Sequence, residues 1–221
     1  MSYQLQTDPF LAARAQMVRT QLMERGIRDP RVLQAMLEVP RHEFVPEELR
    51  PDAYEDRPLP IGAGQTISQP YIVALMLQHL ALRPSDRALD VGTGSGYVTA
   101  LLSRMCAQVH SVERYAELAE SAEKTLKRLG YSNVKVVVGD GTRGLSQYAP
   151  FDAILVSAAA AVVPPALFDQ LQERGRLIVP VGSQYSQELH LIRKISGEPE
   201  IEYLEGCRFV PLISEKEDQK L

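Results

Sequence analysis

Residues 90–96 combine an aspartate with three glycines in an arrangement suited to binding a ligand. The stretch reads Asp90-Val91-Gly92-Thr93-Gly94-Ser95-Gly96 and separates an apolar run, 87–91, from a helical pattern, 97–105. Glycines at such a junction let the backbone turn sharply and let a ligand approach the first N–H groups of the helix. The spacing is not the dinucleotide fingerprint G-x-G-x-x-G, because Tyr97 stands where the third glycine would be. We predict cofactor contacts from Asp90, Gly92, Gly94 and Gly96, with a plain tight turn as the alternative.

Two further acidic residues stand at the ends of predicted strands. Glu113 ends the run 109–113, about 20 residues after the first glycine, where dinucleotide sites place a ribose-binding carboxylate. Its two oxygens can accept both hydroxyl protons of a ribose. Asp140 and Gly141 follow the run 134–138, and the Asp140 carboxylate can accept from an adenine amino group. The alternatives are a solvated acid and a turn-forming aspartate, but two acids at neighbouring strand ends favour a nucleoside ligand.

Longer stretches carry a resemblance to known families. The spacing D-x-G-x-G-x-G resembles the first motif of S-adenosylmethionine-dependent methyltransferases, and the loop Gly64-Gln65-Thr66-Ile67-Ser68-Gln69-Pro70 closely resembles the hallmark loop of protein-L-isoaspartate O-methyltransferases. The likeness to the second family continues at 39–46, 149–152, 175–182 and 208–212. It implies a Rossmann-like class I methyltransferase fold and S-adenosyl-L-methionine as cofactor, with S-adenosyl-L-homocysteine as product. The implied reaction methylates the free α-carboxylate of L-isoaspartyl residues in damaged peptides and in unfolded or aged proteins.

The resemblance also implies roles for individual residues. Ser68 is the expected active-site residue, and Gln65, Thr66, Ile67 and Ser68 are expected to lie against the cofactor. A carboxylate with a pKa near ~4 is ionised at neutral pH, so its attack on a methyl group needs no general base, only alignment. A role for Ser68 as the cap of a helix beginning near Pro70 is the alternative. Val210 and Pro211 are expected to contact the peptide, through backbone pairing.

The sequence departs from the family pattern at two positions. Leu145 follows Gly144 where an aromatic residue is common, and Ala161 ends an alanine run where a proline is common. These loops border the expected cleft, so the departures bear on substrate preference more than on chemistry.

Composition argues against several other kinds of site. The four histidines are scattered, so no metal site is expected, and Cys106 lies among apolar residues with no activating partner. A net charge of −4 and a pI near 5.7 argue against nucleic acid as a partner. The apolar runs are too short to span a membrane, and Asp8-Pro9 interrupts any signal-peptide pattern. Two separated cysteines fit a reduced compartment, so we expect a cytoplasmic protein. We also expect a monomer.

The elements that must position these residues follow a regular order. Apolar runs at 87–91, 109–113, 134–138, 151–156 and 176–181 alternate with helical patterns at 97–105, 116–129 and 165–172. Such alternation predicts βαβ units and a mostly parallel sheet covered on both faces. Residues 188–195 and 201–213 predict two antiparallel strands at the end, in an order that the sequence leaves open.

The amino-terminal third is predicted to consist of helices and irregular chain. Helices are predicted from Asp8-Pro9 to Gly26, from Asp29-Pro30 to Pro40 and from 70 to 80, with irregular chain and a polar loop, 63–68, between them. The predicted organisation is one domain with three parts: a helical cap with the active-site loop, 1–83, a Rossmann-like core, 84–213, and a charged tail, 214–221.

Two other functions stay open from the sequence alone. One is methylation of a small molecule or a nucleic acid; the other is a non-catalytic paralogue that binds the cofactor and a partner. Base methylases usually carry Asn/Asp-Pro-Pro-Tyr after the fourth strand, whereas this chain has Ser157 followed by alanines. The joint presence of Ser68, Asp90, Glu113 and Asp140 favours catalysis.

Overall fold

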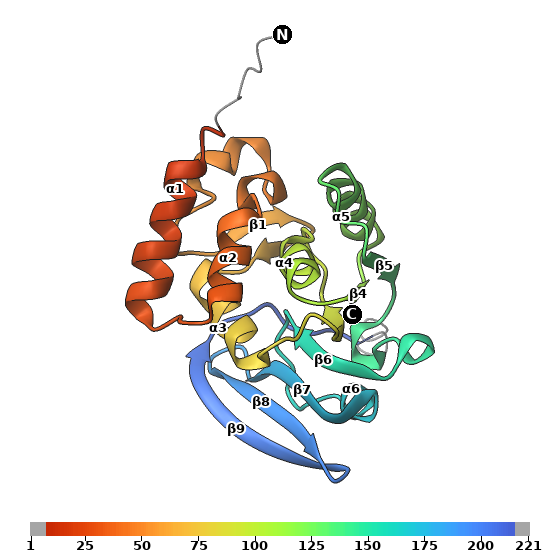
Figure 1. The fold of residues 1–221 in the computed structure, drawn as a ribbon. Helices are drawn as coiled ribbons and strands as arrows, with labels where there is room; N and C mark the ends of the chain where they lie inside the picture. Colours follow the sequence, from red (N-terminus) through yellow and green to blue (C-terminus); the bar gives the residue numbers. More distant parts are fainter. Residues whose placement is uncertain (1–7, 215–221) are drawn as a thin grey trace.

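A seven-stranded sheet forms the centre of the computed structural model, which describes residues 8–214 (Figure 1). Its order is β5–β4–β3–β6–β7–β8–β9. The strands are β3 (Arg87–Val91), β4 (Gln108–Glu113), β5 (Val134–Val138), β6 (Phe151–Val156), β7 (Leu171–Gly182), β8 (Gln187–Ile195) and β9 (Glu198–Cys207). Strands β3 to β7 pair in parallel, and β8 and β9 are antiparallel. The predicted class of sheet is confirmed, and the open question of order is resolved with β9 at the edge.

Strand alternation divides the hydrophobic core into two layers. In β6, Ala153 and Leu155 belong to one cluster of buried side chains, whereas Ile154 and Val156 belong to the other. The period of two is that of a strand buried on both faces, which explains the apolar run 153–156.

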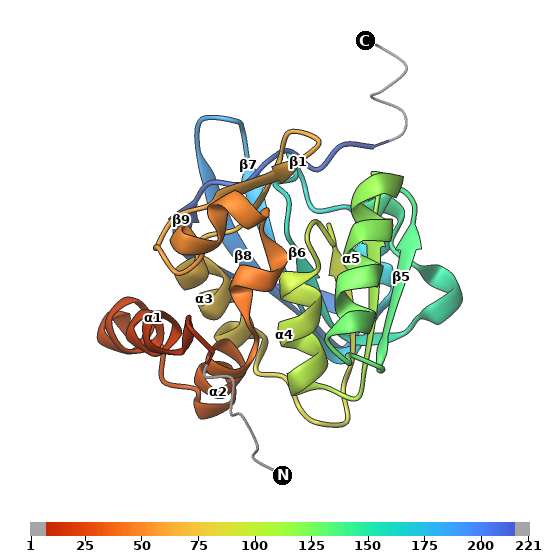
Figure 2. The same ribbon diagram turned by 90° about the horizontal axis from the view of Figure 1, so that it is seen from above.

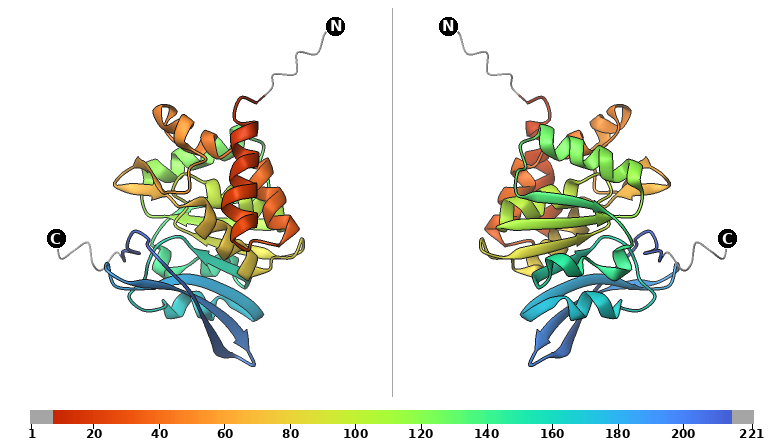
Figure 3. Two further views of the ribbon diagram at one scale, coloured as in Figure 1. Left: turned by 90° about the vertical axis from the view of Figure 1, so that its left-hand side faces the viewer. Right: turned by 90° about the vertical axis from the view of Figure 1, so that its right-hand side faces the viewer.

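Helices cover both faces of the sheet. One face carries α3 (Pro70–Leu80), α4 (Tyr97–Met105) and α5 (Ala116–Arg128), which follow one another along the sheet (Figure 2). The other face carries α6 (Pro165–Asp169) and two 3₁₀ turns, Gly141–Arg143 and Ser146–Tyr148 (Figure 3). None of the helices within residues 8–214 is long and apolar enough to cross a membrane.

The amino-terminal helices lie outside α3 and α4. α1 (Leu11–Gln16) continues as a π-helical stretch (Met17–Leu22) and a 3₁₀ turn (Met23–Arg25) that ends at left-handed Gly26, close to the predicted stop. α2 (Pro30–Glu38) is capped by the Asp29 side chain, as its Asp-Pro start predicts. Two 3₁₀ turns follow, Arg41–Phe44 and Glu47–Asp52. Buried residues of this region, Met17 and Met36 among them, share one core with α4, while the proposed boundary at residue 83 stays a prediction.

Several elements differ from the expected ones, and β9 begins at Glu198 rather than 201. β7 begins at Leu171 rather than 176, because Leu171 pairs with Phe151 across an irregularity in the ladder, and α6 therefore ends at Asp169. The segment expected to be irregular forms a small hairpin of β1 (Leu59–Gly62) and β2 (Gln65–Ile67). The last strand ends at Cys207, and 208–213 run on outside the ladder. The predicted charged tail lies, from 215 on, outside the described residues.

The carboxyl ends of β3 and β6 mark the point where the strand order reverses. From β3 the chain proceeds through β4 to β5 on one side, then returns to β6 on the other side of β3. Ligands of open α/β sheets bind outside the strand ends at this position.

Candidate active site

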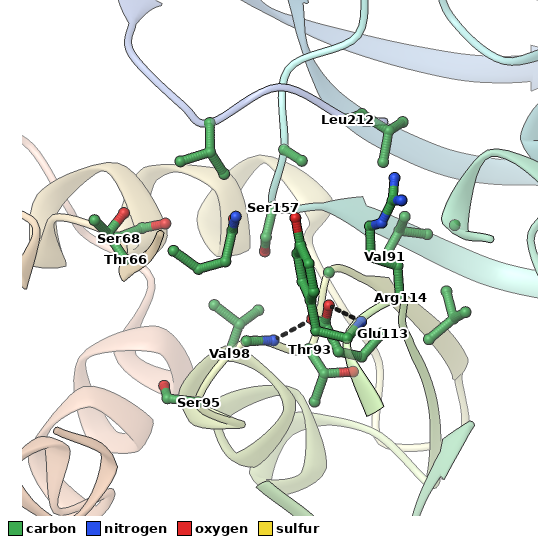
Figure 4. A pocket seen from close by; sticks show the side chains of 18 of the residues that line it. Thr66, Ser68, Val91, Thr93, Ser95, Val98, Glu113, Arg114, Ser157 and Leu212 are labelled. Atoms are coloured by element: carbon green, nitrogen blue, oxygen red, sulfur yellow. Dashed lines mark hydrogen bonds between the residues drawn. The ribbon is translucent and has the colours of Figure 1, made fainter. Parts of the chain in front are cut away.

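A cavity opens at the carboxyl ends of β3 and β4. We call it the first cavity; its open space is about 80 Å³. Its walls come from the loop before α3, the glycine loop, the end of β4, and the turns after β5, β6 and β9 (Figure 4). They comprise Gln65, Thr66, Ile67, Ser68, Val91, Gly92, Thr93, Gly94, Ser95, Tyr97, Val98, Val112, Glu113, Arg114, Tyr115, Gly141, Ser157, Ala158, Val210, Pro211, Leu212 and Ile213.

The glycine loop has the backbone geometry that its sequence predicts. Gly92, Gly94 and Gly96 all have positive φ, at 92°, 53° and 90°. Gly92 and Gly94 line the cavity, whereas Gly96 does not. A Cβ on Gly96 would stand 3.3 Å from side-chain atoms of Ala122 and Leu126 on α5. The third glycine therefore serves helix packing behind the loop, and its predicted cofactor contact has no support in the cavity lining.

Glu113 joins the two loops that frame the cavity. Its Oε2 accepts the Gly94 N–H at 2.8 Å, and its Oε1 accepts the Tyr115 N–H at 3.0 Å (Figure 4). The residue is 6% exposed and lines the cavity. Because each carboxylate oxygen has two lone pairs, both can still accept a hydrogen bond from a ligand.

Asp90 lies behind the cavity instead of facing it. It is fully buried, and its Oδ2 accepts the hydroxyls of Thr99 at 2.6 Å and Ser111 at 3.0 Å. Burial raises the pKa of Asp90 to about 7, against the lowering effect of these two hydrogen bonds. Asp90 therefore fastens α4 and β4 below the loop and is absent from the cavity lining, and its cofactor contact stays a prediction.

The turn after β5 presents its glycine rather than its acid. Asp140 Oδ1 accepts the Thr142 N–H at 2.9 Å and the Thr142 hydroxyl at 2.7 Å. Only Gly141 of the pair lines the cavity, and a Cβ there would stand 2.7 Å from Val91 Cγ1. Asp140 therefore shapes the turn, as the alternative interpretation held, and its adenine contact stays a prediction.

A second cavity adjoins the first and is wider, at about 670 Å³. Five residues line both: Thr66, Ser68, Ser157, Val210 and Pro211. The remaining walls come from the start of α3, the β7–β8 turn and the residues that follow β9. The two cavities therefore share a boundary to which Ser68 belongs.

Ser68 does not cap α3. The cap position belongs to Gln69, whose side chain makes no capping bond, and within residues 8–214 the Ser68 hydroxyl has no hydrogen-bond partner. Asp56 fixes the turn, since its Oδ2 accepts from Gln69 Nε2 at 2.8 Å and its Oδ1 from the Tyr71 N–H at 3.4 Å. The Ser68 hydroxyl is thus left for a ligand.

Residues 208–213, which we call the crossing segment, pass over the strand ends. The Val210 C=O accepts the Ala159 N–H at 2.8 Å, and the Leu212 N–H donates to the Ala159 C=O at 2.7 Å. Arg114 Nη1 donates to the Ile213 C=O at 3.2 Å. The segment therefore closes one side of both cavities, and Val210 and Pro211 lie where they meet.

Sequence reasoning missed several residues of the lining. Ser157 directly follows β6, and Arg114 directly follows Glu113, so the strand-end rule that selected Glu113 would also have found them. Leu212 and Ile213 carried no such signal, because their place depends on where the crossing segment leaves the sheet.

The cysteines and the possible metal ligands are the other candidates for reactive groups. Both cysteines are free, and burial raises the pKa of Cys106 to about 12 and of Cys207 to about 11. Within residues 8–214, no three His, Cys, Asp or Glu side chains gather in a metal-binding arrangement.

Comparison with known proteins gives one consistent result. Residues 13–217 match the family model "Protein-L-isoaspartate(D-aspartate) O-methyltransferase". Two proteins called protein-L-isoaspartate O-methyltransferase are similar: one from Koribacter versatilis, 55% identical over 204 residues and 92% of each chain, and one from Methanoculleus marisnigri, 52% identical over 211 residues and 96% of each chain.

Two solved structures are similar in fold over most of the chain. A protein-L-isoaspartate O-methyltransferase matches 94% of this chain and 69% of its own, with a TM-score of 0.82 and 31% identity. The Plasmodium falciparum protein described as a complex with S-adenosyl-L-homocysteine matches 90% of this chain and 98% of its own, with a TM-score of 0.80 and 33% identity.

Proposed function

The chain belongs to the protein-L-isoaspartate(D-aspartate) O-methyltransferase family, and we propose that its two adjoining cavities hold the two reactants of that enzyme. The enzyme transfers a methyl group from S-adenosylmethionine to the free α-carboxylate of L-isoaspartyl residues. We place the cofactor in the first cavity and the damaged peptide in the second, with methyl transfer where they meet at Ser68.

The first cavity suits the cofactor chemically. Glu113 offers two carboxylate oxygens to ribose hydroxyls, and Gly92 and Gly94 allow close approach of the backbone. Gly141, whose position tolerates no Cβ, leaves room beside the turn for the adenine.

The chemistry that remains for the protein is alignment. S-adenosylmethionine supplies a methyl group on a sulfonium centre, which an ionised carboxylate attacks without a general base. The Ser68 hydroxyl can donate to the non-attacking oxygen of the substrate carboxylate, which fixes the direction of the other. The carrying observation is that this hydroxyl, in a residue that lines both cavities as Thr66 and Ser157 also do, has no partner within residues 8–214.

Replacing Ser68 tests the assignment. Ser68→Ala should lower turnover by roughly 10–10³-fold and change cofactor affinity much less. Ser132→Ala, an exposed serine before β5, is the control. A variant that keeps its turnover and loses only ~1 kcal/mol of stability in thermal melts would assign Ser68 a purely structural role.

The cellular location, the oligomeric state and the protein substrates of the enzyme are also proposals. The free cysteines support a reducing, cytoplasmic location. We also propose that the enzyme acts as a monomer. We propose unfolded and aged proteins as substrates, because their damaged segments can enter the second cavity in extended form.

A further inference from the structure

We propose that Gln187 is a positioning residue for methyl transfer, whose side-chain amide holds the crossing segment where the peptide binds. The inference rests on the proposed function, because it takes the second cavity as the peptide site. Gln187 itself lines that cavity at the start of β8.

The amide of Gln187 continues the sheet where its backbone ladder stops. Gln187 pairs with Cys207, the last residue of β9. Beyond that pair, Gln187 Oε1 accepts the Phe209 N–H at 2.6 Å, and its Nε2 donates to the Phe209 C=O at 3.1 Å. One side chain thus replaces both backbone groups of a missing strand partner.

Burial makes this arrangement specific for glutamine. Gln187 is 7% exposed, and a buried amide needs both a donor and an acceptor as partners. The turn before it is tight: the Ser183 N–H donates to the Ser186 C=O at 3.0 Å, and a Cβ on Gly182 would stand 2.1 Å from that same oxygen. This tight turn therefore fixes the position of the Gln187 backbone, from which the side chain extends.

The hydrogen bonds that hold the crossing segment involve residues that line different cavities. Gln187 holds Phe209, which lines only the second cavity. Ala159 holds Val210, which lines both cavities, and Leu212, and Arg114 holds Ile213; Leu212 and Ile213 line only the first. Loss of the Gln187 amide should therefore disturb the peptide more than the cofactor.

Two substitutions separate this role from simple stabilisation. Gln187→Leu keeps the approximate volume but removes both hydrogen bonds, so the KM for an isoaspartyl peptide should rise roughly 10-fold. The Kd for S-adenosylhomocysteine should stay within about twofold. Gln187→Glu keeps the acceptor for the Phe209 N–H but, when ionised, has no donor for the Phe209 C=O, so its peptide KM should also rise.

Asn133→Ala is the matched control. The Asn133 amide also holds backbone, donating to Ser103 and Cys106 carbonyls at 3.0 and 3.2 Å, but far from both cavities. It should lose stability with the peptide KM unchanged. A peptide KM within twofold of wild type for Gln187→Leu, or equal KM changes in Gln187→Leu and Asn133→Ala, would overturn the positioning role. Failure of the wild-type enzyme to methylate the peptide would instead overturn the proposed function.

Discussion

At the scale of single residues, Glu113 has two roles. Its oxygens hold the Gly94 and Tyr115 amides while they face the first cavity, so the side chain both builds the site and is available to a ligand. A carboxylate that accepts from backbone N–H groups is fixed in direction, and its hydrogen bonds to a ribose therefore need little reordering.

We expect Glu113→Ala to weaken binding of S-adenosylhomocysteine by about 1–3 kcal/mol, because charge-assisted hydrogen bonds are lost. Asp140→Ala should act in the same direction. Titration calorimetry measures both, with Glu117→Ala on the exposed face of α5 as the control. Unchanged affinity in both alanine variants would remove the proposed cofactor site.

Residue types predicted the site better than they predicted individual contacts. Glu113 and Asp90 are both acids at strand ends, yet only Glu113 lines the cavity, because Asp90 turns towards the hydroxyls of Thr99 and Ser111. A sequence pattern locates the strand end but does not show which face a side chain takes when neighbouring hydroxyls compete for it.

At the scale of elements, the crossing segment is the part that chain order alone could not place. Extended character was predicted up to residue 213, but pairing in β9 ends at Cys207. Partners far apart in the sequence then decide the path: Gln187 and Ala159 each bind two backbone groups of the segment, and Arg114 binds one. The regular strands β3 to β6, by contrast, follow closely from their apolar runs.

The crossing segment offers backbone groups to a peptide. Within residues 8–214, the Val210 N–H and the Pro211 C=O make no hydrogen bond, whereas those of Phe209 are taken by Gln187. We expect an extended peptide to pair here through its main chain, in the manner of strand addition. Such pairing would accept many neighbouring side chains.

Isoaspartyl peptides with single backbone N-methyl groups test this pairing. At least one position flanking the damaged residue should lose about 10-fold in kcat/KM when methylated, because one hydrogen bond is removed. The parent peptide and a peptide N-methylated far from the isoaspartate serve as controls. Equal kcat/KM values along the whole series would show that recognition resides in the carboxylate pocket alone.

The whole molecule brings two cavities together at a shared boundary that includes the Ser68 hydroxyl. The sheet supplies the strand ends, the amino-terminal region supplies the loop with Ser68, and the chain after β9 closes the far side. Isoaspartate carries its main chain through the side-chain carbon, so its free carboxylate lies one methylene closer to the backbone than that of aspartate. A site that fixes both the peptide backbone and the carboxylate can reject aspartate by misplacing its oxygen.

The central claim is that this site methylates isoaspartyl residues and excludes normal aspartate. One peptide made in both forms, incubated with the wild-type enzyme and S-adenosylmethionine carrying a labelled methyl group, tests it most directly. We predict saturable label transfer to the isoaspartyl form and at least 100-fold lower kcat/KM for the aspartyl form, the loss expected from a misplacement of about 1 Å. Equal labelling of the two forms, or none of either, would contradict the account.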